Sequence, residues 1–301
     1  RGFDVLDLTK NSNFEECCFL LLHDHLPNKI EFNEFTTKLK EARAIPEQMQ
    51  KNMKNWRKNA HPMDVLQAFV AALAGYYDEQ GSEKEISQQR AINLISKVPT
   101  IIASWERVRN DKEPIQPDPD LSHASNFLYM LTGNKPDKEM ERVFDVCLIL
   151  HADHTFNAST FAAREVASTR AHMYSAVSAA VGALSGELHG GANYEVMKML
   201  LDIKDENNAT NWVKSRIEKG DRIMGMGHAV YKTVDPRSMV LKELSKKLSE
   251  KTGLPWFEIT KKVEETTAEI MKNRKERDIF PNVDLYSASV YYMLNIPMDL
   301  N

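Results

Sequence analysis

A chain of 301 residues with 42% hydrophobic side chains is long enough for one large domain or two unequal ones, and it can bury a sizeable core. Its net charge of -4 at pH 7 provides no overall positive field for nucleic acid or an anionic membrane surface, so an anionic substrate needs local positive charge. The cysteines are Cys17, Cys18 and Cys147, an odd number, which argues against a disulfide framework and for a reducing compartment.

Helical periodicity dominates the first half of the chain. Turn sequences interrupt it, with L-P-N at 26–28 and G-N-K-P at 133–136. Runs of alternating β-branched residues are absent, so we expect an all-α protein. Apolar residues recur every three or four positions in the predicted helices, which cover residues 14–22, 32–42, 46–54, 62–77, 86–110, 122–131 and 138–150.

Small residues predominate in the next segment, at 157–184. Ser159 or Thr160 can cap its start, and Gly182 and Gly186 can close it, which predicts one long helix. Small side chains let helix backbones approach closely, so we expect this helix to lie in a core or in a subunit interface.

Glycine is frequent after this segment, and the helices predicted at 194–203 and 211–219 are short. Asp235 and Pro236 then supply the cap and first turn of a helix that extends to about residue 251. A further helix is predicted at 256–274.

This change in glycine content and helix length predicts two domains. We expect a large helical domain at 1–190, resumed at 288–301, and a smaller helical domain at 191–287. No apolar run approaches the roughly 20 residues that span a bilayer, and no signal peptide is recognisable, so we expect no membrane association and a cytoplasmic location. The sequence opens at Arg1 without Met and stops at Asn301, so we expect it to be truncated at both ends.

Two histidines, His151 and His154, stand three residues apart, a spacing that can place both on one helix face and hold a metal. A stable site needs further ligands, and no Glu or Cys stands at a recognisable spacing, so we expect no metal. The alternative is that one of the pair donates a hydrogen bond to a bound carboxylate.

The motif L-H-G-G-A-N at 188–193 places His189 in irregular chain before a helix. The positive end of that helix would keep the imidazole neutral and make it a hydrogen-bond donor, and the glycines would let a ligand approach the backbone. Asn193 is suited to cap the helix. The alternative is an ordinary loop histidine beside a flexible joint.

A glycine-rich motif, M-G-M-G-H-A-V-Y-K, occupies 224–232. A dinucleotide-binding fingerprint would need a third glycine at Val230 and a preceding strand, and it has neither. What remains is a turn that carries His228, with Lys232 nearby and Arg237 in the next helix, where it can pair with a carboxylate through two hydrogen bonds.

The motif P-N-V-D at 281–284 places Asp284 between apolar neighbours after a proline turn. The carboxylate could be a helix cap, or it could be a desolvated general base.

The order of these motifs resembles the citrate synthase family, which includes the 2-methylcitrate synthases. It runs H-A-D-H followed by N-A-S-T, then L-H-G-G-A-N, G-x-G-H-x-V-Y-K-x-x-D-P-R and P-N-V-D-x-Y-S-A. The likeness extends over nearly the whole chain and is greatest for the shorter bacterial and archaeal type.

The resemblance implies a role for each of the motif residues. It makes Asp284 the base that deprotonates acetyl-CoA, His189 the donor to the enolate oxygen, and His228 the group that polarises the ketone of oxaloacetate. Oxaloacetate would be bound by His189, His228 and three further residues, which are His154, Asn157 and Arg237.

The resemblance also implies partners. The family's enzymes are homodimers of the tricarboxylic acid cycle that need no metal and no bound cofactor, with coenzyme A entering as a thioester substrate. In the family the smaller domain closes over oxaloacetate, which fits a hinge near Gly190 and Gly191. For coenzyme A we expect contacts from Ile223, Met224, Gly225, Gly227 and Lys232, with Lys272 or Lys275 as further candidates.

Some features depart from the family pattern. Tyr194 stands where many relatives have Glu or Gln, and Ala229 where many bacterial relatives have Arg, but neither change removes a catalytic group. The family's chain continues beyond Asn301 with two arginines that bind substrate carboxylates, so a chain that ended there is expected to have little or no activity.

The leading hypothesis is therefore a citrate synthase that condenses acetyl-CoA with oxaloacetate and hydrolyses citryl-CoA. The first alternative is a 2-methylcitrate synthase that uses propionyl-CoA. Others are an inactive helical binding scaffold and a metal-dependent hydrolase that uses His151 and His154.

Overall fold

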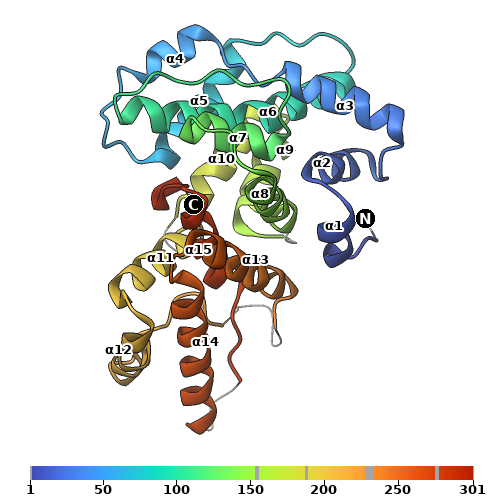
Figure 1. Cartoon of the computed structure of the whole chain (residues 1–301). Helices are drawn as coiled ribbons and strands as arrows, with labels where there is room; N and C mark the ends of the chain where they lie inside the picture. Colours follow the sequence, from blue (N-terminus) through green and yellow to red (C-terminus); the bar gives the residue numbers. More distant parts are fainter. Residues whose placement is uncertain (1, 153–155, 187–188, 228–233, 275–277, 301) are drawn as a thin grey trace. The chain divides into compact units, whose positions relative to one another are not determined.

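The computed structural model describes residues 2–152, 156–186, 189–227, 234–274 and 278–300. Across these ranges the chain forms fifteen α-helices and two short 3-10 helices, and its β pairing is an isolated bridge between Met226 and Pro281 (Figure 1). The all-α prediction is confirmed. None of the helices in the described ranges is long and apolar enough to cross a membrane.

Contacts along the chain define two compact units. Unit 1 comprises Arg1–His189 with Leu300, and unit 2 comprises Gly190–Asp299 with Asn301. The boundary lies one residue before the expected one. Residues 288–299 differ from the expectation, because they belong to unit 2 rather than returning to the large domain. The physical reason is that one unbroken helix, Val283–Met293, packs on other helices of unit 2.

Unit 1 is built around a long helix, α6, on which α3, α4, α5, α7 and α10 pack. Its main core cluster joins α4, α5, α6 and α10 and includes the fully buried Met49, Ile101 and Trp105. The helices of unit 1 are α1 (Val5–Asn11), α2 (Phe14–His23), α3 (Lys29–Glu41), α4 (Glu47–Met53), α5 (Pro62–Ala72), η1 (Leu73–Gly75), α6 (Glu83–Arg109), α7 (His123–Thr132), α8 (Lys138–His151), α9 (Ala158–Ser168) and α10 (Met173–Leu184).

Capping boxes start several of these helices earlier than the apolar pattern predicts. Helix α3 begins at Lys29 because Asn28 and Glu31 hydrogen-bond each other's backbone, and α6 begins at Glu83 because Ser82 and Glu85 do the same.

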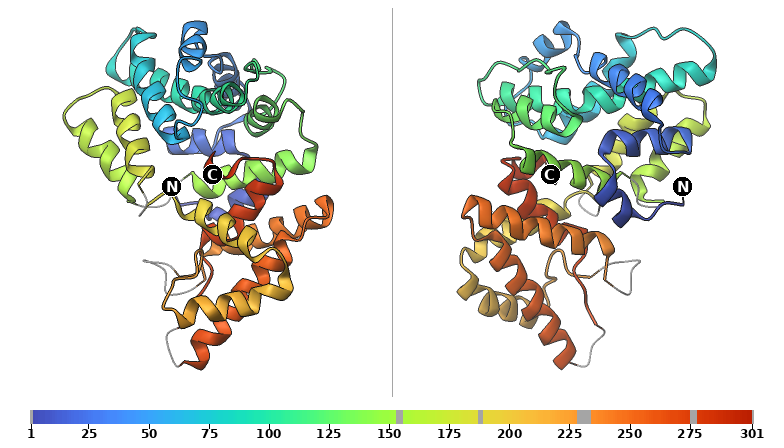
Figure 2. Two further views of the ribbon diagram at one scale, coloured as in Figure 1. Left: turned by 90° about the vertical axis from the view of Figure 1, so that its left-hand side faces the viewer. Right: turned by 45° about the vertical axis from the view of Figure 1, so that its right-hand side comes forward.

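The single long helix predicted at 157–184 was wrong, because the segment forms two helices, α9 and α10, that lie side by side (Figure 2). Arg170 adopts a left-handed backbone with φ of 62° between them. His172 then caps α10 by accepting from the Ser175 N–H at 3.1 Å. Asn157, rather than Ser159 or Thr160, caps α9.

Unit 2 is centred on α15, which contacts α11, α13 and α14 and is buried along most of its length. Helix α13 begins at the Asp235 cap with Pro236 in its first turn and ends at Gly253 in a left-handed conformation, as the sequence predicts. The elements of unit 2 are α11 (Ala192–Ile203), α12 (Glu206–Glu218), α13 (Pro236–Thr252), α14 (Trp256–Asn273) and α15 (Val283–Met293), followed by the short helix η2 (Met298–Leu300).

Candidate active site

Asp284 lies in the first turn of α15, but it is not the cap of that helix. Asn282 is the cap, and its Oδ1 accepts from the Asp284 N–H at 2.9 Å. The Asp284 carboxylate instead accepts from Asn193 Nδ2 at 3.0 Å through Oδ1. Among the described residues no donor reaches the other oxygen, Oδ2. The structure thus excludes the capping alternative and leaves one carboxylate oxygen able to take a proton.

The environment of Asp284 makes its carboxylate unusually basic. Burial raises its pKa to about 6, while the Arg237 charge lowers the pKa and the Asp235 charge raises it. A carboxyl with this pKa is mostly ionised at neutral pH and is still a stronger base than an exposed aspartate.

Arg237 is positioned by the buried cap of α13. Its guanidinium donates from Nε to Asp235 Oδ1 at 3.1 Å and from Nη2 to Asp235 Oδ2 at 2.7 Å. Both side chains are buried, with 6% of Arg237 and 1% of Asp235 exposed. The bidentate geometry that the sequence predicts for a substrate carboxylate is thus formed with a carboxylate of the chain itself.

The glycine-rich turn packs directly against the start of α15. Gly227 N donates to Phe280 O at 2.8 Å, and Asn282 N donates to Gly225 O at 2.9 Å. Asn282 Nδ2 also donates to Gly227 O at 2.9 Å. Two motifs that are more than fifty residues apart therefore form one structure that holds Asp284.

Gly225 is required by this close approach. Its φ is 78°, and a Cβ at this position would lie 2.8 Å from Leu285 Cα. Ile223, which the sequence analysis expects to contact coenzyme A, is buried, with 6% exposed.

A cavity of about 270 Å³ adjoins the same segment of unit 2. Lys272 from α14 lines it together with Phe280 and Pro281 from the chain that leads to Asp284. Of the other cations proposed for coenzyme A, Lys232 and Lys275 lie outside the described residues, as does His228.

His189, at the end of unit 1, contacts the start of α9. Its Nε2 accepts from the Ser159 backbone N–H at 3.3 Å and lies 2.8 Å from Ser159 Oγ. Ser159 Oγ also lies 2.9 Å from Oδ1 of Asn157, the α9 cap. Ser159 thus holds the His189 ring against the first turn of α9, because both its backbone N–H and its hydroxyl reach Nε2.

The helix terminus that the His189 ring contacts is that of α9, whereas the sequence analysis expects the start of the following helix, α11, to act on it. Asn193 was also misassigned: Gly191 stands at the cap position of α11, and the Asn193 side chain bonds Asp284 instead. Ser159 and Ser287 were missed as hydrogen-bond partners in this region. Ser287 stands three residues after Asp284, a helical spacing that places both on one face.

His151 ends α8, and its Nδ1 lies 2.7 Å from Cys147 O. Within the described ranges no three His, Cys, Asp or Glu side chains cluster as metal ligands would. His154 lies outside those ranges, so the expected absence of a metal stays a prediction.

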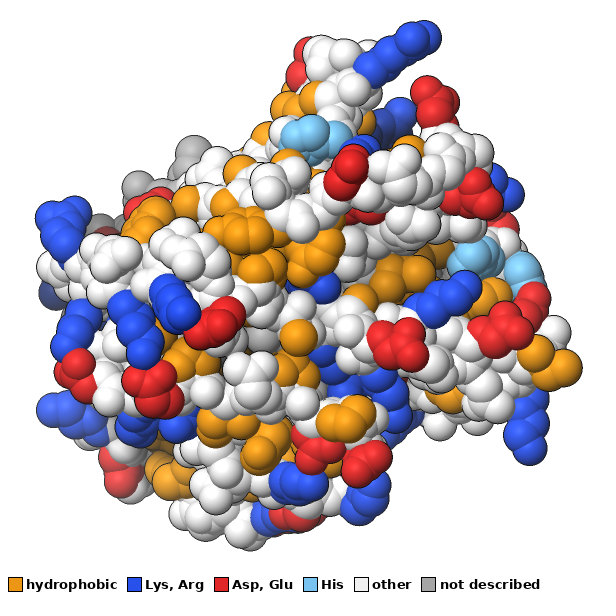
Figure 3. Space-filling view, turned by 90° about the horizontal axis from the view of Figure 1, so that it is seen from above, with side chains coloured by type: hydrophobic (Ala, Val, Ile, Leu, Met, Phe, Trp, Pro, Cys, Tyr) orange, Lys and Arg blue, Asp and Glu red, His pale blue; other side chains and the backbone are white. Residues whose placement is uncertain are grey.

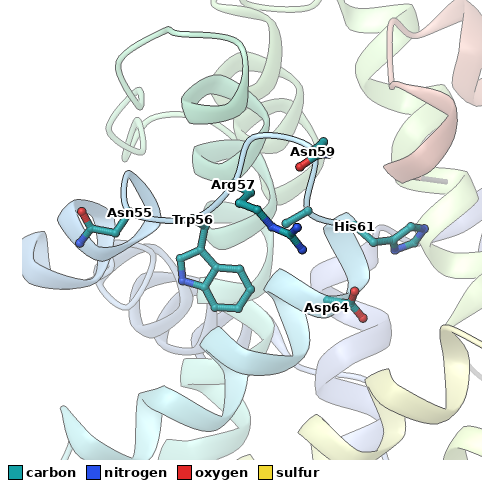
Figure 4. A pocket seen from close by; sticks show the side chains of 7 residues that line it. Asn55, Trp56, Arg57, Asn59, His61 and Asp64 are labelled. Carbon is teal, nitrogen blue, oxygen red and sulfur yellow. The ribbon is translucent and has the colours of Figure 1, made fainter.

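A surface hollow of about 510 Å³ in unit 1 is lined by no residue of the four sequence motifs. Its labelled side chains, which include Trp56, Arg57 and His61, spread along the rim rather than converge on one point (Figure 4). Basic and acidic side chains are interspersed over the molecular face that Figure 3 shows. Neither feature offers a reaction centre comparable to Asp284.

Comparison with known proteins decides the family. The model of the citrate synthase C-terminal domain matches residues 1–301. The chain belongs to the citrate synthase family. As a member of this family it is an enzyme that condenses and transfers an acyl group.

Named relatives cover the chain almost completely. Citrate synthase 2 of Bacillus subtilis is 43% identical over 99% of this chain and 80% of its own length. The citrate/2-methylcitrate synthase of the same organism is 38% identical over 100% of this chain and 80% of its own length.

A solved relative has the same fold. Citrate synthase from Thermoplasma acidophilum, in a ternary complex with carboxymethyl coenzyme A and oxaloacetate, is 30% identical with a TM-score of 0.90. The match covers 99% of this chain and 78% of that one.

Replacing Gly225 tests the packing that holds the start of α15. Gly225→Ala adds a Cβ at positive φ that also collides with the Leu285 backbone, whereas Gly220→Ala adds one at φ of 80° in open space. Both variants incur the left-handed cost of about 1–2 kcal/mol, and we expect Gly225→Ala to lose at least about 1 kcal/mol more. Urea unfolding of the two variants measures the difference, and equal losses would contradict the close approach.

Proposed function

We propose that the chain condenses acetyl-CoA with oxaloacetate and hydrolyses the resulting citryl-CoA to citrate and coenzyme A. The observation that carries this proposal is the Asp284 carboxylate, which is desolvated, held through one oxygen by Asn193 and without a described donor to the other. Family membership supplies the reaction class in which such a base is needed.

The first step is removal of a proton from the methyl carbon of acetyl-CoA, which is a very weak acid. Asp284 Oδ2 takes this proton, and its raised pKa increases the driving force for the transfer. Negative charge then develops on the thioester oxygen, where a hydrogen-bond donor stabilises it most effectively in a site without water.

His189 suits the donor role, because an imidazole can donate from a ring nitrogen and Ser159 holds this ring at the start of α9. The methyl carbon then attacks the ketone carbon of oxaloacetate, and the ketone oxygen takes up a proton. The resemblance gives that step to His228. Water finally adds to the citryl thioester carbonyl, the carbon–sulfur bond breaks, and coenzyme A leaves as the thiol.

The two substrates are proposed to contact different sets of residues. For oxaloacetate we propose Arg237 and Asn157 alongside the two catalytic histidines and His154. For coenzyme A we propose the backbone of Ile223, Met224, Gly225 and Gly227 with Lys232 and the Lys272 cavity. This proposal includes no bound cofactor, because coenzyme A is consumed as a thioester and released. Action in the tricarboxylic acid cycle and a cytoplasmic location stay predictions.

The rival substrate is propionyl-CoA, which would make the product 2-methylcitrate. One relative bears both names, so family membership alone does not decide between acetyl-CoA and propionyl-CoA. One methylene changes selectivity by about 1–3 kcal/mol, or roughly 10-fold to 200-fold. We expect kcat/KM of the full-length protein, measured by oxaloacetate-dependent thiol release, to favour acetyl-CoA at least tenfold, by the same principle. Equal values would leave acetyl-CoA unsupported as the preferred substrate, and a preference for propionyl-CoA would assign 2-methylcitrate as the product.

The Asp284→Asn variant tests the base. The amide cannot take the methyl proton, so we expect kcat for thiol release to fall by about 10²–10⁴. Asp202→Asn makes the same chemical change on an exposed side chain of α11 and is expected to leave the rate unchanged. Wild-type activity in Asp284→Asn would remove Asp284 from the mechanism.

We also propose that the chain forms a homodimer through α9. Among the described residues α9 packs on α10, but it contains no fully buried residue, and Phe161 is 57% exposed. Phe156 is 54% exposed and contacts Phe161 edge to face. A surface of this kind is typical of an interface.

Charge placed on α9 tests the dimer. Phe161→Asp would force a carboxylate into the buried interface, so we expect the dimer dissociation constant to rise at least about tenfold in sedimentation experiments. Met239→Asp changes an equally exposed apolar residue on α13 and is expected to leave the assembly intact. A dimer unaffected by Phe161→Asp would place the interface elsewhere.

A further inference from the structure

Three polar side chains form a chain of hydrogen bonds that ends at Asp284. Ser287 Oγ donates to Asn193 Oδ1 at 2.7 Å, and Asn193 Nδ2 donates to Asp284 Oδ1 at 3.0 Å. Ser287 and Asp284 stand one turn apart on α15, and Asn193 reaches them from the first turn of α11, which packs on α15.

The Asp284 carboxylate only accepts, so it requires the NH₂ end of the Asn193 amide, and the hydroxyl of Ser287 satisfies the other end. An amide has one accepting and one donating end, and the two ends exchange if the group turns over. A hydroxyl that donates to Oδ1 holds that end toward Ser287 and directs the NH₂ group at the carboxylate. Ser287 is fully buried, with 0% exposed, so water does not compete for its hydrogen.

We propose that Asn193, oriented by Ser287, is a positioning residue that holds the Asp284 carboxylate in the direction needed for proton abstraction. This inference rests on the proposed function of Asp284 as the base. The amide binds Oδ1, so Oδ2 is the oxygen presented to the substrate. A donor to one oxygen also stabilises the carboxylate without occupying the atom that reacts.

Other charges near Asp284 do not supply this orientation. From the start of α13, Arg237 and Asp235 act on the carboxylate through their charge, and they hydrogen-bond each other. From α14, Glu264 binds Lys242 and the Tyr286 hydroxyl instead. Among the described residues, Asn193 is the one hydrogen-bond donor to the Asp284 carboxylate.

A matched pair of serine variants separates positioning from stability. Ser287 and Ser289 are both fully buried on α15, but Ser289 Oγ bonds Tyr286 O and Ser245, away from Asp284. Ser287→Ala and Ser289→Ala thus remove the same atom from the same helix. Rates of thiol release by the full-length variants would be measured from pH 5 to pH 8 at saturating and limiting acetyl-CoA.

In the wild type, kcat/KM should fall as the pH decreases through about 6, where Asp284 takes up its proton. Ser287→Ala leaves Oδ1 of the Asn193 amide without its donor and so loosens the amide that holds Asp284. We expect kcat to fall roughly tenfold and KM to change by less than about twofold. Loss of the donor raises the pKa of Asp284, so the acid limb should move about half a unit or more to higher pH. Ser289→Ala should keep the wild-type profile.

Asn193→Asp provides a second test if Ser287→Ala fails to fold. The replacement is nearly isosteric and keeps the oxygen that accepts from Ser287, but it places a carboxylate oxygen against Asp284. Like-charge repulsion should move the acid limb up by about one unit or more.

The outcomes separate this inference from the proposed function. A wild-type protein without oxaloacetate-dependent thiol release would overturn both. An active wild type with Ser287→Ala matching Ser289→Ala, or with Asn193→Asp leaving the acid limb in place, would overturn the positioning role and leave the proposed function standing.

Discussion

The close packing of a glycine turn against the start of α15 is the constraint on which the site depends, because it holds the desolvated carboxylate of Asp284. Gly225 lies so close to Leu285 that a Cβ does not fit there, and the turn at 225–227 is hydrogen-bonded to the chain on both sides of Pro281. These contacts hold the start of α15, whose first turn contains Asp284. The position of the base is therefore a property of how the turn and the helix pack.

The energetics of unit 2 reflect this arrangement. Burial of Asp284 opposes its ionisation, and the cost is offset by packing of an almost wholly buried helix on three neighbours. Tyr286 anchors the same helix by donating to Glu264, which also binds Lys242 at 2.8 Å. A desolvated base can be tolerated here because the surrounding side chains are fixed independently of it.

A related principle operates at His189 in unit 1. The first turn of a helix has backbone N–H groups without partners, and α9 satisfies one of them with the His189 ring. The ring also lies 2.8 Å from the Ser159 hydroxyl in the same turn. In both units a helix terminus thus contacts or carries a side chain assigned to catalysis.

The sequence by itself determined the helical class, most helix positions, and the identity of His189, His228 and Asp284 as members of one family pattern. Periodicity and short motifs suffice for these because they depend on neighbours within a few residues. Tertiary structure decided that Asn193 binds Asp284 instead of capping α11, that Arg237 pairs with Asp235, and that α9 and α10 are separate helices. Asn193, for example, could cap its own helix or bind a side chain that folding brings near, and 91 residues separate it from Asp284. Local sequence cannot rank those partners, because their energies depend on desolvation and distance that exist only once the helices have packed.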